Sequence, residues 1–67
     1  MSTLGDEYPK QQARLRNIMR ALAEIGPSGH FLIAIIEDIM RRADKAVIDQ
    51  DVVGMVAVFK EMQEVKE

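Results

Sequence analysis

Phe31-Leu32-Ile33-Ala34-Ile35-Ile36 places six apolar residues in succession near the middle of a chain of 67 residues. Burial of such side chains supplies the main favourable free energy of folding. The stretch is far shorter than the roughly 18 residues that indicate a membrane-spanning helix. We therefore expect it to lie in a protein core or at a contact with another chain.

The residues around this stretch predict a helix over 29–48. Apolar residues recur there at intervals of three and four, and charged residues occupy the opposite side. Glu37 precedes Arg41 by four positions, an order that stabilises a helix by about 0.2–0.5 kcal/mol. Ser28 is a suitable N-cap, because its hydroxyl can accept a free backbone N–H of the first turn. Ile33 falls on the polar side. The apolar stripe contains Leu32, Ile35, Ile36, Ile39, Met40, Ala43, Ala46 and Val47.

The preceding segment predicts another helix over 8–25. Pro9 suits the first turn of a helix, where its missing N–H leaves no hydrogen bond unmade. Gly26 and Pro27 end this helix, because glycine can adopt a left-handed closing conformation and proline cannot continue the hydrogen bonding. Residues 1–7 are predicted to be a flexible N-terminal tail. The apolar stripe contains Leu15, Ile18, Met19, Leu22 and Ile25.

The last segment predicts a helix over 51–65. Asp51 is its best N-cap. The valine-rich sequence that follows would also suit a strand, and Gly54 costs a helix about 1 kcal/mol relative to alanine. A strand is nevertheless disfavoured, because the chain has no second strand-like stretch with which its backbone could pair. The apolar stripe contains Val52, Met55, Val56, Phe59 and Met62.

Three such helices with short connections predict an all-α fold, either a three-helix bundle or an open three-helix arrangement. Residues 8–67 would form a single helical domain. A domain of this size buries only about 60% of the surface that its unfolded chain exposes. The chain has no cysteine for a disulfide and a single histidine, too few for a zinc site. Its stability must therefore come from close helix packing or from self-association.

The sequence carries no motif of an enzyme. Catalysis requires a nucleophile, an acid or base and a group that stabilises developing charge, and the single histidine, His30, stands at a helix start beside apolar residues. The glycines of segment 26–29 lack the spacing and the lysine of a phosphate-binding loop. Asp49 and Asp51 lack the further ligands of a calcium loop. We therefore expect a non-enzymatic protein with no catalytic residues, no cofactor and no metal.

Charge is distributed unevenly, although the net charge is only −2. Four basic residues against one glutamate give segment 9–25 a charge of +3, and two lysines against five carboxylates give segment 49–67 a charge of −3. A basic helix can contact phosphates, so a nucleic-acid-associated regulator is the alternative function. In a helix-turn-helix protein the last helix would read the bases, and here that helix is net acidic and rich in valine. The favoured interpretation of the basic segment is therefore a solvated face, or one that pairs with the acidic last helix. The candidate phosphate contacts are Lys10, Arg14, Arg16 and Arg20.

Apolar residues exceed what a three-helix core can cover. Each helix needs an apolar face of somewhat more than about 100°, and the helices over 29–48 and 51–65 have wider ones. Contiguous exposed apolar surface usually marks an interaction site. We therefore expect an interaction or assembly module that forms a homo-oligomer or docks on another protein through these two helices. Phe31 is expected at the edge of the core, and Ile33 is the residue most expected to meet another chain. The candidate interface residues are Ile33, Val53, Val58 and Val65.

Four stretches of the chain resemble small, uncharacterised proteins encoded by bacteriophages and prophages. They are Tyr8-Pro-Lys-Gln-Gln-Ala-Arg14, Ile25-Gly-Pro-Ser-Gly29, Arg42-Ala-Asp-Lys-Ala46, and Asp51-Val-Val-Gly-Met55 followed by Phe59-Lys-Glu-Met62. The resemblance implies origin and size, and it assigns no catalytic or binding residues. Because the chain also lacks a secretory signal and an apolar stretch of membrane length, we expect a cytoplasmic protein without membrane association, in the host cell if it is phage-encoded.

Overall fold

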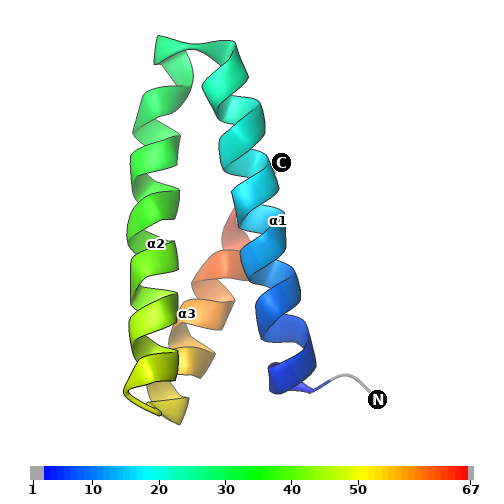
Figure 1. Cartoon of the computed structure of the whole chain (residues 1–67), viewed down its shortest axis with the longest axis vertical. Coiled ribbons are helices and arrows are strands. Elements are labelled where there is room, and N and C mark those ends of the chain that lie inside the picture. The colour runs from blue at the N-terminus through cyan, green and yellow to red at the C-terminus, as the bar shows by residue number, and fades with distance from the viewer. Residues whose placement is uncertain (1–2, 67) are drawn as a thin grey trace.

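A computed structural model of the chain describes residues 3–66 and shows three helices, with no strand in that range. Helix α1 spans Leu4–Ile25, a short 3₁₀ turn η1 spans Pro27–Gly29, α2 spans His30–Ile48 and α3 spans Val52–Glu64. In Figure 1, α1 and α2 form an antiparallel hairpin joined at the top, and α3 rises from the lower end of α2. The predicted all-α three-helix fold is confirmed.

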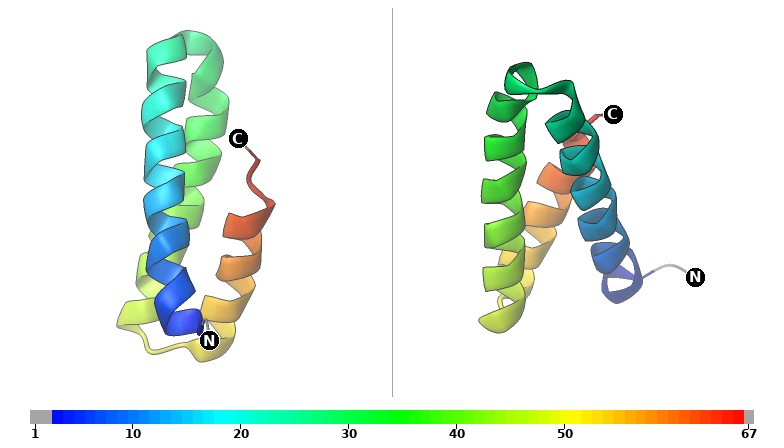
Figure 2. Two further views of the ribbon diagram at one scale, coloured as in Figure 1. Left: turned by 90° about the vertical axis from the view of Figure 1, so that its right-hand side faces the viewer. Right: turned by 45° about the horizontal axis from the view of Figure 1, so that its top comes forward.

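The helices differ in length, and this difference leaves the fold open at one end. α1 has 22 residues and α3 has 13, so at 1.5 Å per residue α3 is about 13 Å shorter. Figure 2 shows α3 and the C-terminal segment against one side of the hairpin, ending short of its tip. The radius of gyration is 12.3 Å, against about 11 Å for a compact domain of this length. The three helices therefore pack on one another as a bundle, which the shorter α3 leaves open at the hairpin tip.

Helix α1 begins four residues earlier than predicted. Thr3 is its N-cap, and the hydroxyl Oγ1 of Thr3 accepts the backbone N–H of Asp6 at 3.2 Å. The prediction of a flexible tail over 1–7 is wrong for residues 4–7, while residues 1 and 2 lie outside the described range. Pro9 lies inside the helix rather than at its start. A threonine three positions ahead of an acidic residue is the sequence signal that marks the actual start.

The connection between α1 and α2 is tight at two glycines. Gly26 has a φ of 96°, a conformation that favours glycine. Gly29 is buried, and a Cβ at this position would lie 2.6 Å from the carbonyl oxygen of Leu22. Gly29 is also the N-cap of α2 and offers no capping side chain, so the prediction of Ser28 as the N-cap is wrong. The N-cap position lies so close to the backbone of α1 that only glycine fits there, and α2 therefore begins without a capping side chain.

The connection between α2 and α3 closes around Gln50, which has a φ of 53°. The N–H of Gln50 donates to the carbonyl of Val47 at 3.1 Å, and the N–H of Asp51 donates to that of Ala46 at 2.9 Å. This pair of bonds is typical of a helix end closed by a left-handed residue, usually glycine. The carboxylate of Asp51 then accepts the N–H of Gly54 at 2.9 Å. The prediction of Asp51 as the N-cap of the third helix is confirmed.

Substitution of Gln50 by glycine should stabilise the protein. A non-glycine residue in the left-handed region carries a penalty of about 1–2 kcal/mol, partly offset by the greater freedom of glycine in the unfolded chain. We expect Gln50→Gly to raise the free energy of unfolding by about 0.5–1 kcal/mol, measured by urea denaturation. Ala57→Gly, within α3, should lower it by about 1 kcal/mol. A Gln50→Gly variant that is less stable than the wild type would contradict this account of the turn.

The core lies where the three helices meet, and Tyr8 of α1 reaches both other helices. The hydroxyl of Tyr8 donates a 2.7 Å hydrogen bond to the carbonyl oxygen of Ala43 on α2. The ring of Tyr8 stacks on Phe59 of α3, with the centroids 6.4 Å apart. Burial raises the pKa of Tyr8, and the negative charge of Asp44 adds to the shift. The buried core cluster contains Tyr8, Leu15, Ile18, Ile36, Ile39, Ala43, Val58 and Met62.

Candidate interaction surface

The apolar stripe of α3 faces a different direction from the predicted one. Val58, a predicted interface residue, is 3% exposed and belongs to the core, so that prediction is wrong. Val52 and Val56, which the prediction placed in the core, are exposed. The helix is turned about its axis by about 50° relative to the prediction, at 100° per residue, because it packs against α1 and α2 at once. The apolar residues of α3 that face the core are Met55, Val58, Phe59 and Met62.

The other predicted interface residues differ in exposure. Val53 is 81% exposed on α3, as an interface residue should be in the free chain. Ile33 is half-buried on α2, and Val65 is half-buried against the core at the end of α3. Phe31, expected at the edge of the core, is instead 78% exposed. Within the apolar stretch that opens α2, Phe31 therefore exposes a larger fraction of its side chain to solvent than Ile33 does.

In residues 3–66, the exposed large apolar side chains fall into two groups at opposite ends of the molecule. One group surrounds the tip of the α1–α2 hairpin, at the top of Figure 1, and the other surrounds the α2–α3 connection at the bottom. Each group brings together residues from two helices. The group at the tip contains Ile25, Phe31 and Ile35, and the group at the lower end contains Val47, Ile48, Val52, Val53 and Val56.

An open groove with a volume of about 450 Å³ lies between the upper halves of α1 and α2. It adjoins the exposed apolar group at the hairpin tip. Concave apolar surfaces of this kind accept apolar groups and leave a few polar residues at the edge to fix orientation. The residues that line the groove are Asn17, Ile18, Ala21, Leu22, Ile25, Leu32 and Lys66.

Arg14 holds the end of α3 against α1. Its guanidinium donates to the carbonyl oxygen of Met62 at 2.7 Å and to that of Val65 at 3.0 Å, while its Nε donates to Gln11 at 2.9 Å. The last carbonyls of a helix have no intrahelical partner, and a cation there also complements the helix dipole. Arg14, a predicted phosphate contact, is therefore bonded within the fold, where it joins the first helix to the third.

The other predicted phosphate contacts lie exposed on α1. Lys10 pairs with Glu7 at 3.5 Å, and Arg20 donates to the side-chain oxygen of Asn17 at 3.5 Å. Arg16 and Arg20 share one face of the helix, whereas Lys10 is about 120° from Arg16 around the axis. The structure therefore does not gather the four predicted residues into one basic patch.

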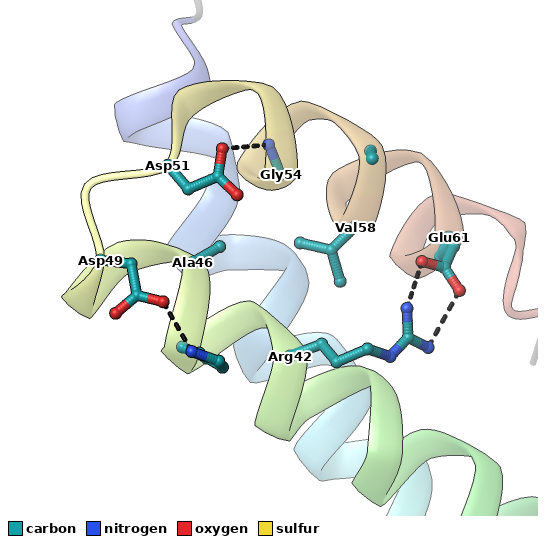
Figure 3. Close-up of a pocket in the computed structure, with 9 residues that line it drawn as sticks. Arg42, Ala46, Asp49, Asp51, Gly54, Val58 and Glu61 are labelled. Atoms are coloured by element: carbon teal, nitrogen blue, oxygen red, sulfur yellow. Dashed lines mark hydrogen bonds and ion pairs between the residues drawn. The ribbon is translucent and has the colours of Figure 1, made fainter.

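A pocket between the lower part of α2 and α3 is lined by charged residues that bond to one another (Figure 3). Arg42 donates to the two carboxylate oxygens of Glu61 at 2.6 and 3.0 Å, and to Asp38 at 2.9 Å. The hydrogen bonds from Arg42 lower the pKa of Glu61, and those from Arg41 and Arg42 lower the pKa of Asp38. Bidentate pairing of this kind fixes geometry as well as charge. Arg42 thereby links α2 to α3.

Acidification should weaken this link. The pKa values of Asp38 and Glu61 lie below their ordinary values of 3.8 and 4.5. Their contribution to stability is therefore present above those ordinary values and is lost as the pH falls through the folded-state values. We expect the free energy of unfolding to decrease as the pH is lowered below about 5. At neutral pH, Arg42→Met should lower the free energy of unfolding by about 0.5–1 kcal/mol. Arg41→Met, which leaves the link to α3 intact, is the control. An Arg42→Met variant as acid-sensitive as the wild type would contradict the assignment.

The described residues do not form the sites of several other functional classes. Across the range 3–66, no group of three or more histidine, cysteine, aspartate or glutamate side chains is arranged to hold a metal ion. Within those residues, none of the helices is both long and apolar enough to cross a membrane. Comparisons of the chain with protein-family models, with curated proteins and with solved structures gave no match.

Proposed function

We propose that this protein is a non-enzymatic interaction or assembly module that self-associates through apolar surface on α2 and α3. The observation that carries the proposal is the exposure of large apolar side chains on so short a chain, foremost Val53 at 81%, Ile48 at 79% and Phe31 at 78%. Single exposed apolar residues are common on monomers. Here they have exposed apolar neighbours, which is the arrangement that favours association.

The extent of the surface supports the same proposal. The chain exposes 4708 Å², against about 4300 Å² for a compact monomer of its mass. The core is correspondingly small, and its largest fully buried side chains are Leu15, Ile36 and Met62. An open fold of this kind is stabilised when a second chain covers its apolar surface, because binding to the folded state alone shifts the folding equilibrium. Association would supply stabilisation that a chain without cysteine cannot obtain from disulfides.

Sedimentation equilibrium of the full chain tests this function. We expect a weight-average mass above the monomer value of 7.6 kDa at concentrations between about 10 µM and 1 mM, the range in which small interfaces associate. The midpoint of thermal unfolding should rise with protein concentration for the same reason. A mass equal to that of the monomer over the whole range would overturn the proposal.

The alternative function, contact of nucleic acid through α1, has less support. Arg14 is bonded to carbonyls of the third helix and Lys10 lies on a different face from Arg16, so phosphate contacts would depend on a few scattered side chains. A gel-shift titration on nonspecific duplex at low salt would detect such contacts. The origin in a bacteriophage or prophage and the cytoplasmic location stay predictions from the sequence.

A further inference from the structure

α3 covers only the lower part of one side of the α1–α2 hairpin, and two arginines mark the extent of this cover. On α1, Arg14 contacts carbonyl oxygens of Met62 and Val65 at the end of α3. On α2, Arg42 contacts Glu61, one turn before that end. Beyond these contacts each helix of the hairpin continues toward its tip for about three turns, without α3 beside it (Figure 1).

The face of α1 that α3 covers lower down is apolar beyond the end of α3. Residues seven and eleven positions apart lie within about 20° of each other around a helix. Ala21 and Ile25 therefore continue the face that carries Arg14. Both residues are exposed, and both line the groove at the hairpin tip together with the half-buried Leu22. The first helix thus presents an apolar strip of just over one turn, from Ala21 to Ile25, beyond the end of α3.

The corresponding face of α2 has the same character. Ile35 and Phe31 lie seven and eleven positions before Arg42, so they continue the face that contacts α3. Both are exposed, and Leu32 beside them lines the groove. The apolar residues from the two helices flank one another across the hairpin, and we refer to them as the tip surface. The tip surface consists of Ala21, Leu22, Ile25, Phe31, Leu32 and Ile35.

Charge favours a second copy of this chain as the occupant. From 25 to 36 the sequence contains no aspartate, glutamate, lysine or arginine. Lys66, which stands in the lining of the groove, comes from the C-terminal segment. Two copies of a charged patch would repel each other, whereas two uncharged apolar patches do not. A strongly charged partner, in contrast, would find no complementary group on the tip surface itself.

The area of the tip surface is also of the size that a small dimer requires. Ile25 is 64% exposed, Phe31 78% and Ile35 41%. An aromatic side chain can bury about 150–250 Å², so these residues and their half-buried neighbours leave roughly 500 Å² per copy to be covered. Two copies would together bury about 1000 Å², the lower limit for a specific interface. The expected dimer is therefore weak, with a Kd in the micromolar to millimolar range.

We propose that the tip surface binds the tip surface of a second copy, giving a dimer with two-fold symmetry. Phe31 is exposed and directly precedes Leu32, which lines the groove of about 450 Å³, and a groove of this volume offers room for a phenyl ring. A two-fold arrangement places Phe31 of each copy in the groove of the other, and it closes the assembly after two molecules. This inference rests on the self-association in the proposed function, and it moves the interface from the valines of α3 to the tip of the α1–α2 hairpin.

Two matched variants test the location of the interface. Phe31 and Val53 are each the second residue of a helix, and they are 78% and 81% exposed. Aspartate is compatible with the first turn of a helix in both places, so Phe31→Asp and Val53→Asp should both fold, as circular dichroism would verify. In sedimentation equilibrium we expect Phe31→Asp to weaken dimerisation at least tenfold and Val53→Asp to dimerise like the wild type.

Each other outcome has a definite meaning. Wild-type affinity in Phe31→Asp, or weakened dimerisation confined to Val53→Asp, would overturn the tip-to-tip dimer and leave self-association standing. A wild-type chain that remains monomeric throughout would overturn both the dimer and the proposed function. Amide chemical shifts give a second measurement, since dilution should change those of residues 18–35 more than those of residues 52–60.

Discussion

Replacement of Tyr8 by alanine should destabilise the protein by about 3–5 kcal/mol, the range found when a buried aromatic side chain is truncated. Tyr8 is 3% exposed and contacts both other helices, through its hydrogen bond to Ala43 and its stacking on Phe59. A domain of this length has a total stability of only about 3–10 kcal/mol. We therefore expect Tyr8→Ala to be largely unfolded at room temperature, as measured by circular dichroism and urea denaturation.

Two control variants separate the ring of Tyr8 from its hydroxyl. Tyr8→Phe keeps the ring and its stacking on Phe59 and loses the hydrogen bond, so it should cost only about 1 kcal/mol. Phe31→Ala removes an exposed aromatic side chain and should change the stability of the monomer by less than about 0.5 kcal/mol. If Tyr8→Ala were as stable as Tyr8→Phe, the ring would not hold the helices together.

The raised pKa of Tyr8 gives the same contact a pH dependence. Because the folded-state pKa lies above the unfolded value of 10.0, the neutral hydroxyl stabilises the fold fully below that value. Its contribution is lost as the pH rises through the folded-state pKa. Lys45, whose pKa is raised by its hydrogen bond to Asp49, loses its contribution in the same direction. The wild type should therefore lose more stability above pH 10 than Tyr8→Phe does, and absorbance titration of the single tyrosine measures the shift directly.

The periodicity of apolar residues is sufficient to predict that the three helices exist. It is not sufficient to predict which face of the third helix points to the core. In α3, Met55, Phe59 and Met62 belong both to the predicted stripe and to the observed one. The two stripes differ in whether Val52 and Val56, or Val58, complete the apolar face. All three are valines, so periodicity cannot rank the alternatives. The choice depends on where the surfaces of α1 and α2 meet α3, which involves residues far apart in sequence.

Local signals explain the boundaries that the prediction missed. Tyr8 lies two turns before Leu15 and extends the apolar stripe of α1 backwards, which also favours a helix that begins before Pro9. Thr3 ahead of Asp6 marks that start, so both features could have been found in the sequence. The left-handed conformation of Gln50 could not have been found in the sequence, because glutamine rarely adopts it. Hydrogen bonding at the end of α2 holds Gln50 in this conformation.

The sequence predicts that exposed apolar surface exists, but it identifies only some of the residues that form it. The excess of apolar residues on the second and third helices was read correctly from the sequence, and Val53 is exposed as expected. Phe31 was missed because its exposure depends on the point at which α3 ends. The helical stripe that includes Phe31 is covered lower on α2, where Arg42 contacts Glu61. The apolar periodicity of α2 alone does not show where the neighbouring helix α3 ends, and so it cannot predict which residues of α2 are left exposed.

Replacement of Arg14 by methionine should lower the free energy of unfolding by about 1.5–3 kcal/mol, the range for hydrogen bonds to a charged group. Methionine keeps much of the apolar stem and removes the donors to Met62 and Val65. Amide exchange should therefore increase most in the last turn of α3. Arg14→Lys should recover only part of the loss, because a single ammonium group cannot reproduce the planar fork of the guanidinium.

Arg16→Met is the matched control, since Arg16 is an exposed arginine of the same helix and should change the stability by less than about 0.5 kcal/mol. Equal effects of Arg14→Met and Arg16→Met would show that the loss came from net charge rather than from the contact with α3. If the contact with α3 is responsible, the segment that carries Val65 and Lys66 should move away from α1 in Arg14→Met. The groove at the hairpin tip would then widen toward α3, because Lys66 lines it. Arg14 thus holds the end of α3 against α1 at the lower border of the groove.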